Sequence, residues 1–73
     1  METTLSKNIK HLMKDRELKQ EWLAQKCQVH QNTTSRWITG KSEPSATGLY
    51  RLAKAFNVSM ESLMEENHDY DIQ

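Results

Sequence analysis

Apolar residues near the start of the chain are spaced at the period of an α-helix. One stripe of such a helix is formed by Leu5, Ile9, Leu12 and Met13. Thr3 or Thr4 can cap its first turn with a hydroxyl oxygen. This pattern predicts a helix over about residues 4–16, and the polar stretch 15–19 indicates a break after it.

The same spacing continues downstream and predicts four further helices. They cover about residues 20–27, about 31–38, about 46–56, and a short segment that follows Ser59. Gly40 and Asn57 stand where a left-handed residue would end a helix at little steric cost. Pro44 marks a loop, and Ser45 and Ser59 can each cap a following helix.

No segment alternates apolar and polar residues as an exposed strand does, and no internal repeat is found. The fold class is therefore predicted to be all-α. A chain of 73 residues allows one domain, which we place at residues 1–64, followed by a polar, acidic and flexible tail at 65–73. A hydrophobic core of this size gives a net folding stability of only about 3–5 kcal/mol. A partner chain would therefore help to stabilise the domain.

Charge is distributed unevenly, although ten basic and ten acidic residues balance over the whole chain. Residues 1–64 hold all ten bases and six acids, for a net charge of +4, and residues 65–73 hold four acids and no base. Because a polyanion responds to local charge, the basic body remains compatible with binding to nucleic acid.

Several function classes are disfavoured by the composition. Cys27 is the only cysteine, so no intrachain disulfide can form, and Cys27 and His30 lack a second pair at zinc-ligand spacing. We expect no metal and no cofactor. The longest apolar runs are too short for a membrane span, no secretory signal is found, and the chain is expected to be cytoplasmic. Asp69 and Asp71 lie in the predicted tail, which does not hold the geometry that acid–base catalysis needs, so no enzyme is predicted.

The segment 31–38 carries the most informative side chains. If Thr34, Trp37 and Ile38 face inward, amides, hydroxyls and a guanidinium remain on the outward side. These groups suit the edges of DNA bases, because Gln and Asn pair with adenine and Arg with guanine. The alternative is an ordinary solvated polar face. Two short helices joined by a turn of about three residues are typical of the helix-turn-helix arrangement.

Residues 8–64 resemble the lambda-repressor-like helix-turn-helix family, which includes phage Cro proteins and xenobiotic-response-element regulators. The resemblance rests on the sequence at 18–24, on Trp37 followed by Gly40-Lys41 and Pro44, and on the sequence at 52–59 leading to Leu63. It implies a compact five-helix domain whose second and third helices form the reading unit. The implied DNA-binding residues are Lys19, Gln20, Gln31, Asn32, Thr33, Ser35, Arg36, Thr39 and Lys41.

In well-known members of the family, a Gln that opens the second helix braces a Gln that opens the third. Gln20 and Gln31 match these positions. Gln20 can therefore hold a phosphate oxygen while it orients Gln31 towards a base, helped by the positive end of its helix. Lys19 and Lys41 serve either as phosphate contacts or only to aid solubility.

Five positions depart from the family pattern. Gln28 stands where the turn usually has Gly, so it either adopts a left-handed conformation at a cost of about 1 kcal/mol or changes the turn. His30 and Lys19 replace the usual caps of the two helices, and Thr34 replaces a buried aliphatic residue. Ile38 stands where the family often has Glu and adds apolar surface near the DNA face.

The sequence therefore predicts a transcriptional regulator that binds double-stranded DNA through the major groove. Because one small domain reads one half-site, we expect a homodimer that represses transcription from a palindromic operator. The dimer contact is expected either in the loop 41–45 or at Met60, Met64, Tyr70 and Ile72.

The alternative is a protein-interaction module that meets its partner through Trp22, Ile38 or the acidic tail. A Trp22 ring that packs over Leu18 is the simpler interpretation of Trp22. The chain is also compatible with being one domain of a longer regulator.

Overall fold

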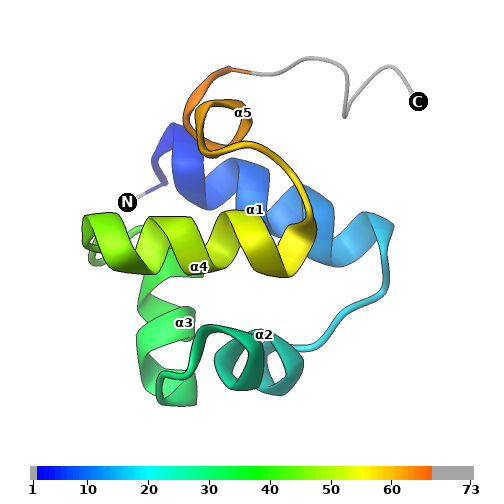
Figure 1. Ribbon diagram of the computed structural model, residues 1–73, viewed down its shortest axis with the longest axis vertical. Coiled ribbons are helices and arrows are strands. Elements are labelled where there is room, and N and C mark those ends of the chain that lie inside the picture. The colour runs from blue at the N-terminus through cyan, green and yellow to red at the C-terminus, as the bar shows by residue number, and fades with distance from the viewer. Residues whose placement is uncertain (1, 67–73) are drawn as a thin grey trace.

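The computed structural model describes residues 2–66 of the chain, and within them it contains five helices and no strand (Figure 1). The predicted Tyr70 and Ile72 contacts and most of the predicted tail lie outside the described residues. The helices are α1 (Thr4–Asp15), α2 (Gln20–Cys27), α3 (Gln31–Thr39), α4 (Ala46–Phe56) and α5 (Met60–Met64).

Local capping explains most of the helix boundaries. The hydroxyl oxygens of Thr3, Ser45 and Ser59 accept hydrogen bonds from the first turns of α1, α4 and α5. Gly40 and Asn57 end α3 and α4 in the left-handed conformation, as the sequence predicts. The predicted bounds need two small corrections, because α1 ends one residue earlier, at Asp15, and α3 ends one residue later, at Thr39.

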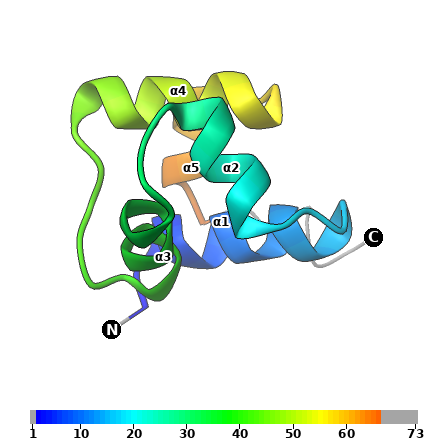
Figure 2. The same cartoon turned by 90° about the horizontal axis from the view of Figure 1, so that it is seen from below.

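The helices enclose one apolar core. In Figures 1 and 2, α1 and α4 lie on opposite sides of the domain, α5 is at one end, and α2 and α3 are at the other. α2 contacts both α3 and α4, while α1 contacts α3 and α5. The largest fully buried apolar side chains come from four of the five helices and are Ile9, Leu23, Leu52, Phe56 and Leu63. The radius of gyration is 11.0 Å.

A buried amide joins the two ends of the sequence. The Asn8 side chain in α1 is 4% exposed, and its Nδ2 donates to the backbone oxygens of Leu63 at 2.7 Å and Glu65 at 2.8 Å. These carbonyls belong to the last turn of α5 and the residue after it, where helical partners are missing. Asn8 therefore supplies the cap that holds the short α5 against α1.

Three connections contain a residue other than glycine in the left-handed region, and these residues are Glu17, Gln28 and Asn57. Gln28 has a φ of 60° and a ψ of 44°, which confirms the first of the two turn geometries that the sequence allows. Glu17, between α1 and α2, has a φ of 54°, which the sequence analysis did not anticipate. At Gln28 and at Glu17 the backbone adopts a conformation that costs about 1 kcal/mol more than it would with glycine.

Candidate nucleic-acid interface

α2 and α3 form a compact pair separated by residues 28–30. The backbone N–H of Val29 donates to the Ala24 oxygen at 3.0 Å, and that of Gln28 donates to the Gln25 oxygen at 3.2 Å. These bonds close the last turn of α2 and direct the chain into α3. The turn needs no glycine because its hydrogen bonds and the packing of Val29 against the core offset the strain at Gln28.

α3 has one buried and one open side, as its sequence predicts. Thr34, Trp37 and Ile38 are buried. The Thr34 hydroxyl donates to the Gln31 backbone oxygen at 2.8 Å, so this polar group is satisfied although the family usually has an aliphatic residue there. Ile38, which stands where the family often has Glu, is buried in the apolar core. Its side chain therefore adds little apolar surface beside the outward face of α3.

The outward side of α3 presents the predicted base-contacting groups. Gln31, Asn32, Arg36 and Thr39 are exposed, whereas Thr33 and Ser35 are half-buried. The Thr39 hydroxyl donates to the Ser35 oxygen at 2.9 Å, so this hydroxyl would face a base as an acceptor.

Gln20 and Gln31 line one depression with a volume of about 400 Å³, together with His30, Asn32 and Ser35. Among the described residues, no hydrogen bond joins the two glutamine side chains, and neither amide has another partner. The structure therefore brings the two residues together without showing the bracing contact that the resemblance implies. Both amides remain available to a ligand that enters the depression.

A second depression of about 330 Å³ shares Asn32 and Ser35 with the first. Its other lining residues are Arg36, Thr39 and Lys41. Seven of the nine predicted site residues thus line two adjoining hollows. Of the remaining two, Thr33 lines neither hollow, and Lys19 lies beside the first at the start of α2.

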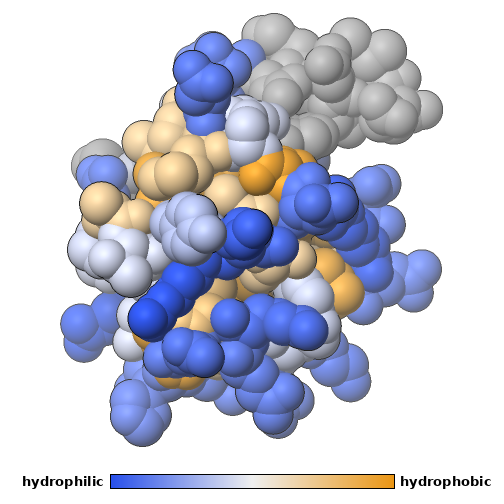
Figure 3. Space-filling model, viewed as in Figure 1, coloured by the Kyte–Doolittle hydropathy of each residue, from blue (hydrophilic) through white to orange (hydrophobic). Residues whose placement is uncertain are grey.

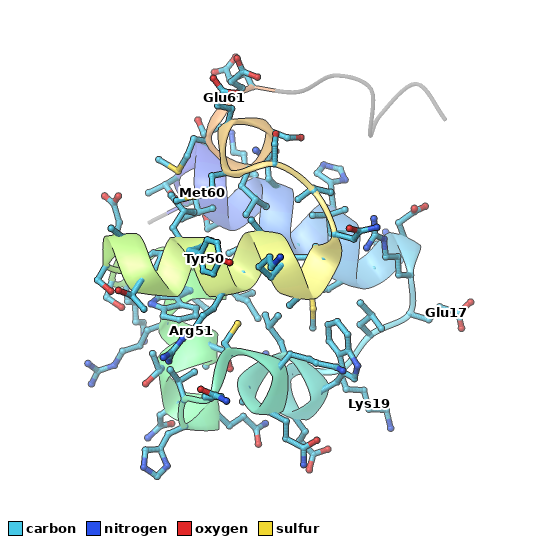
Figure 4. All side chains as sticks on the ribbon, in the orientation of Figure 1. Glu17, Lys19, Tyr50, Arg51, Met60 and Glu61 are labelled. Carbon is cyan, nitrogen blue, oxygen red and sulfur yellow. The ribbon has the colours of Figure 1, made fainter. Side chains whose placement is uncertain are left out.

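A larger groove of about 720 Å³ runs between α1 and the α2–α3 pair. Lys19 is on its rim with Gln20 and Gln31, and Figure 4 shows the Lys19 side chain projecting away from the body of the domain. Lys10 and Lys14 of α1 also line this groove. Lys10 forms an ion pair with Glu2, whereas Lys14 is exposed.

Lys14 is a candidate phosphate contact that the sequence analysis missed. The available signal was its helical spacing of four residues from Lys10, which places both ammonium groups on one side of α1. That spacing does not say which side faces α2, and only the packing of α1 on the α2–α3 pair does. Glu17 and Glu21 line the same groove and partly offset its positive charge.

The starts of α2 and α3 differ from those of the other helices. Lys19 and His30 occupy the capping positions, and neither side chain makes a capping hydrogen bond. The backbone N–H of Thr33 donates to the His30 oxygen at 2.9 Å, and the N–H groups at the first two positions of each helix remain open to an external acceptor. Two such helix ends lie beside the first depression, where the helix dipoles favour an anion such as phosphate.

Trp22 is packed within the domain more than it is presented to a partner. Its ring lies 6.2 Å from that of Phe56, between centroids, and the side chain is half-buried. Leu18, over which the sequence favours packing of this ring, also lies against the apolar core, and the ring contact with Phe56 adds a link to α4. The Phe56 contact anchors α2 to α4 and thereby fixes the position of the reading unit.

The structure gives no evidence of a metal site at Cys27 and His30. Cys27 is buried and His30 is exposed, and burial raises the pKa of the Cys27 thiol to about 11, an effect partly opposed by the Arg51 guanidinium. In the described part of the chain, no group of three or more potential His, Cys, Asp or Glu ligands is found. None of the helices in residues 2–66 is both long and apolar enough to cross a membrane.

Comparison with known families identifies this arrangement. The family model described as helix-turn-helix matches residues 9–63, which begin within α1, end within α5 and include the whole of α2, α3 and α4. The chain belongs to the lambda-repressor-like helix-turn-helix family. As a member, it has a DNA-binding, regulatory fold in which α2 and α3 are the helix-turn-helix pair. No curated protein and no solved structure matches the chain.

Proposed function

We propose that this helix-turn-helix protein is a sequence-specific repressor that binds a palindromic operator as a homodimer. The observation that supports this most strongly is the continuity of the outward face of α3 with the uncapped start of α2. Base-contacting side chains and phosphate-binding N–H groups thus share one surface. Residues 1–64 would be the DNA-binding domain, and residues 65–73 an acidic tail.

The dimensions of α3 suit a major groove. Its nine residues correspond to a length of about 14 Å at the helical rise, and the groove is about 12 Å wide. Gln31, Asn32 and Arg36 would read base edges, with Ser35 and Thr39 as shorter contacts. Lys19, Gln20 and Lys41 would hold phosphates on either side, which gives affinity but no sequence choice.

Two copies are proposed because one α3 makes too few base contacts. Three or four contacts of about 1–3 kcal/mol each do not separate one operator from the many competing sites in a genome. The domain measures 32 × 21 × 21 Å, so two adjacent copies can place their reading helices about 34 Å apart, which is one turn of DNA. Occupancy of such an operator excludes polymerase sterically.

The α5 side of the domain is the better candidate for the dimer contact. Met64 is 45% exposed and Met60 is half-buried, and Figure 3 shows apolar surface around α5 and the adjoining part of α4. The loop 41–45 offers only Pro44 as an apolar side chain. We therefore favour Met60 and Met64 over the loop.

Selection of bound fragments from random double-stranded DNA tests the proposed function. We expect enrichment of a palindrome whose half-sites lie about 10 base pairs apart. The logarithm of the affinity for the selected duplex should then fall linearly with the logarithm of the salt concentration, with a slope of about −0.9 per phosphate contact. No enrichment at low salt, or an affinity that salt leaves unchanged, would contradict the proposal and favour a protein-interaction module.

A further inference from the structure

A second cationic surface lies at the far end of α2 from Gln20. The α2–α4 patch consists of the residues around a shallow depression of about 330 Å³, which are Lys26, Gln28, Tyr50, Arg51, Lys54 and Ala55. Figure 4 shows Tyr50 and Arg51 on α4, and Figure 3 shows strongly hydrophilic surface across the middle of the same face. The assigned DNA-binding surface does not include any of these residues.

The three cations of the patch are held by contacts that leave their charge in place. Nη1 of Arg51 donates to the backbone oxygen of Cys27 at 3.3 Å, at the end of α2. Nζ of Lys54 lies 5.7 Å from the centroid of the Tyr50 ring, and Nζ of Lys26 lies 5.9 Å from that of Trp22. A backbone carbonyl and an aromatic face orient a cation without neutralising it.

No carboxylate among residues 2–66 lines the depression, and within this range the only salt bridge is the one between Lys10 and Glu2. The patch is therefore a concentration of unpaired positive charge in a chain whose total charge is zero. The Tyr50 side chain is 52% exposed, the largest exposed fraction of any bulky apolar or aromatic side chain in the described residues. Exposed aromatic rings and arginines are typical of protein contact surfaces.

We propose that the α2–α4 patch docks an acidic peptide segment of a partner protein. Carboxylates would pair with Lys26, Arg51 and Lys54, and Tyr50 would supply apolar contact area. The Gln28 amide can both donate to and accept from a peptide backbone. The depression is shallow and its cations are spread over two helices, which suits an extended segment with several charges better than one small anion.

The position of the patch favours protein over DNA as the occupant. The eight residues of α2 separate it from Gln20 by about 12 Å along the helix. A partner could thus contact the regulator while α3 occupies a groove, which goes beyond the proposed DNA-binding function.

Fluorescence anisotropy with a defined probe tests this inference on the full chain at low salt. The probe is a fluorescein-labelled decapeptide of alternating Glu and Ala, and its control has Gln in place of Glu. We expect binding of the Glu peptide only. Lys54→Glu should weaken that binding about fivefold or more, because it replaces one attraction by a repulsion.

Lys7→Glu is the matched control, since Lys7 is also an exposed helical lysine and its replacement changes the net charge equally. It should change the peptide affinity less than about twofold. Equal losses in the two variants would show attraction to total charge and overturn the docking site. Unfolding curves of both variants establish that each is folded at the assay temperature.

Two further measurements separate other occupants. If Lys54→Glu weakens duplex binding more than Lys7→Glu does, the patch is a second DNA contact and the proposal is overturned. If replacing Asp69 and Asp71 by Asn raises the peptide affinity about fivefold or more, the chain's own acidic segment occupies the patch, which also overturns it. The peptide assay needs no operator, so it remains decisive even if the random-DNA selection fails.

Discussion

The indole ring of Trp37 in α3 lies against Gly48 in α4 with no room for a side chain between them. A Cβ atom at Gly48 would lie 3.3 Å from Cζ2 of Trp37 and 3.0 Å from Cβ of Pro44. Both distances are shorter than ordinary van der Waals contact. The missing side chain at position 48 therefore sets how closely α4 approaches the helix that carries the polar reading face.

Gly48→Ala should lower the free energy of unfolding by about 1 kcal/mol, because overpacking against two rigid rings outweighs the gain in helix propensity. Urea denaturation measures this change. Thr47→Ala is the control at the neighbouring exposed position of α4 and should change stability by less than about 0.5 kcal/mol. A Gly48→Ala variant that is more stable than the parent would show that Trp37 and Pro44 move aside freely.

Asn8→Ala should cost about 2 kcal/mol, because it leaves two backbone oxygens at the end of α5 without their donor. Asn8→Asp should be more destabilising at pH 7 than at pH 4, since an ionised carboxylate has no proton to donate to these carbonyls. Thermal unfolding at both pH values gives the comparison, with Lys7→Ala as the exposed control on α1. A variant at position 8 that unfolds like Lys7→Ala would exclude the capping role of Asn8.

Gln28→Gly should raise the free energy of unfolding by about 1 kcal/mol, because glycine adopts the left-handed conformation without strain. Asn57 has almost the same φ, 59°, and asparagine tolerates this region better than glutamine. Asn57→Gly should therefore raise the free energy of unfolding by less than half as much as Gln28→Gly. Guanidinium denaturation measures the free energy of unfolding of both variants. Equal increases would show that the strain does not depend on the residue type.

The free energy of unfolding should fall in alkaline solution because of the ionisation of Cys27. Burial raises the pKa of this thiol from 9.0 to about 11. Between these values the unfolded chain loses the thiol proton while the folded chain keeps it, so the free energy of unfolding falls as pH rises. Cys27→Ala should remove this part of the decline, as measured by denaturation at pH 8 and pH 11. Identical pH dependence in the parent and the variant would refute the assignment to Cys27.

The two kinds of predicted DNA contact should respond differently to substitution. Gln31→Ala should relax base choice at one position of each half-site, with a loss of about 1–3 kcal/mol in discrimination. Lys41→Ala should weaken binding to all sequences alike and flatten the salt slope by about one unit. Titrations of the selected duplex and of a point-substituted duplex at several salt concentrations measure both effects. Unchanged binding in both variants would remove the site assignment.

The α2–α3 pair shows what could be read from the chain before its packing was known. The inward side of α3 at Thr34, Trp37 and Ile38 follows from helical spacing, and the burial of all three residues bears this out. By contrast, the place of Lys14 in the groove depends on how α1 packs against the α2–α3 pair, which no local spacing determines. The contact of Trp22 with Phe56 also could not be predicted from local spacing, because Phe56 is distant along the chain and close only in the folded domain.

Sequence alone determined the number and order of the helices and the polar character of α3, because caps, helical periods and left-handed end residues act over a few neighbouring positions. Tertiary structure decided that Asn8 caps α5, that Gly48 admits Trp37, and that cations of α2 and α4 meet in one patch. These relationships join residues that no local pattern connects. They depend on the packing angles between whole helices. These angles are determined by the combined packing of all the core side chains.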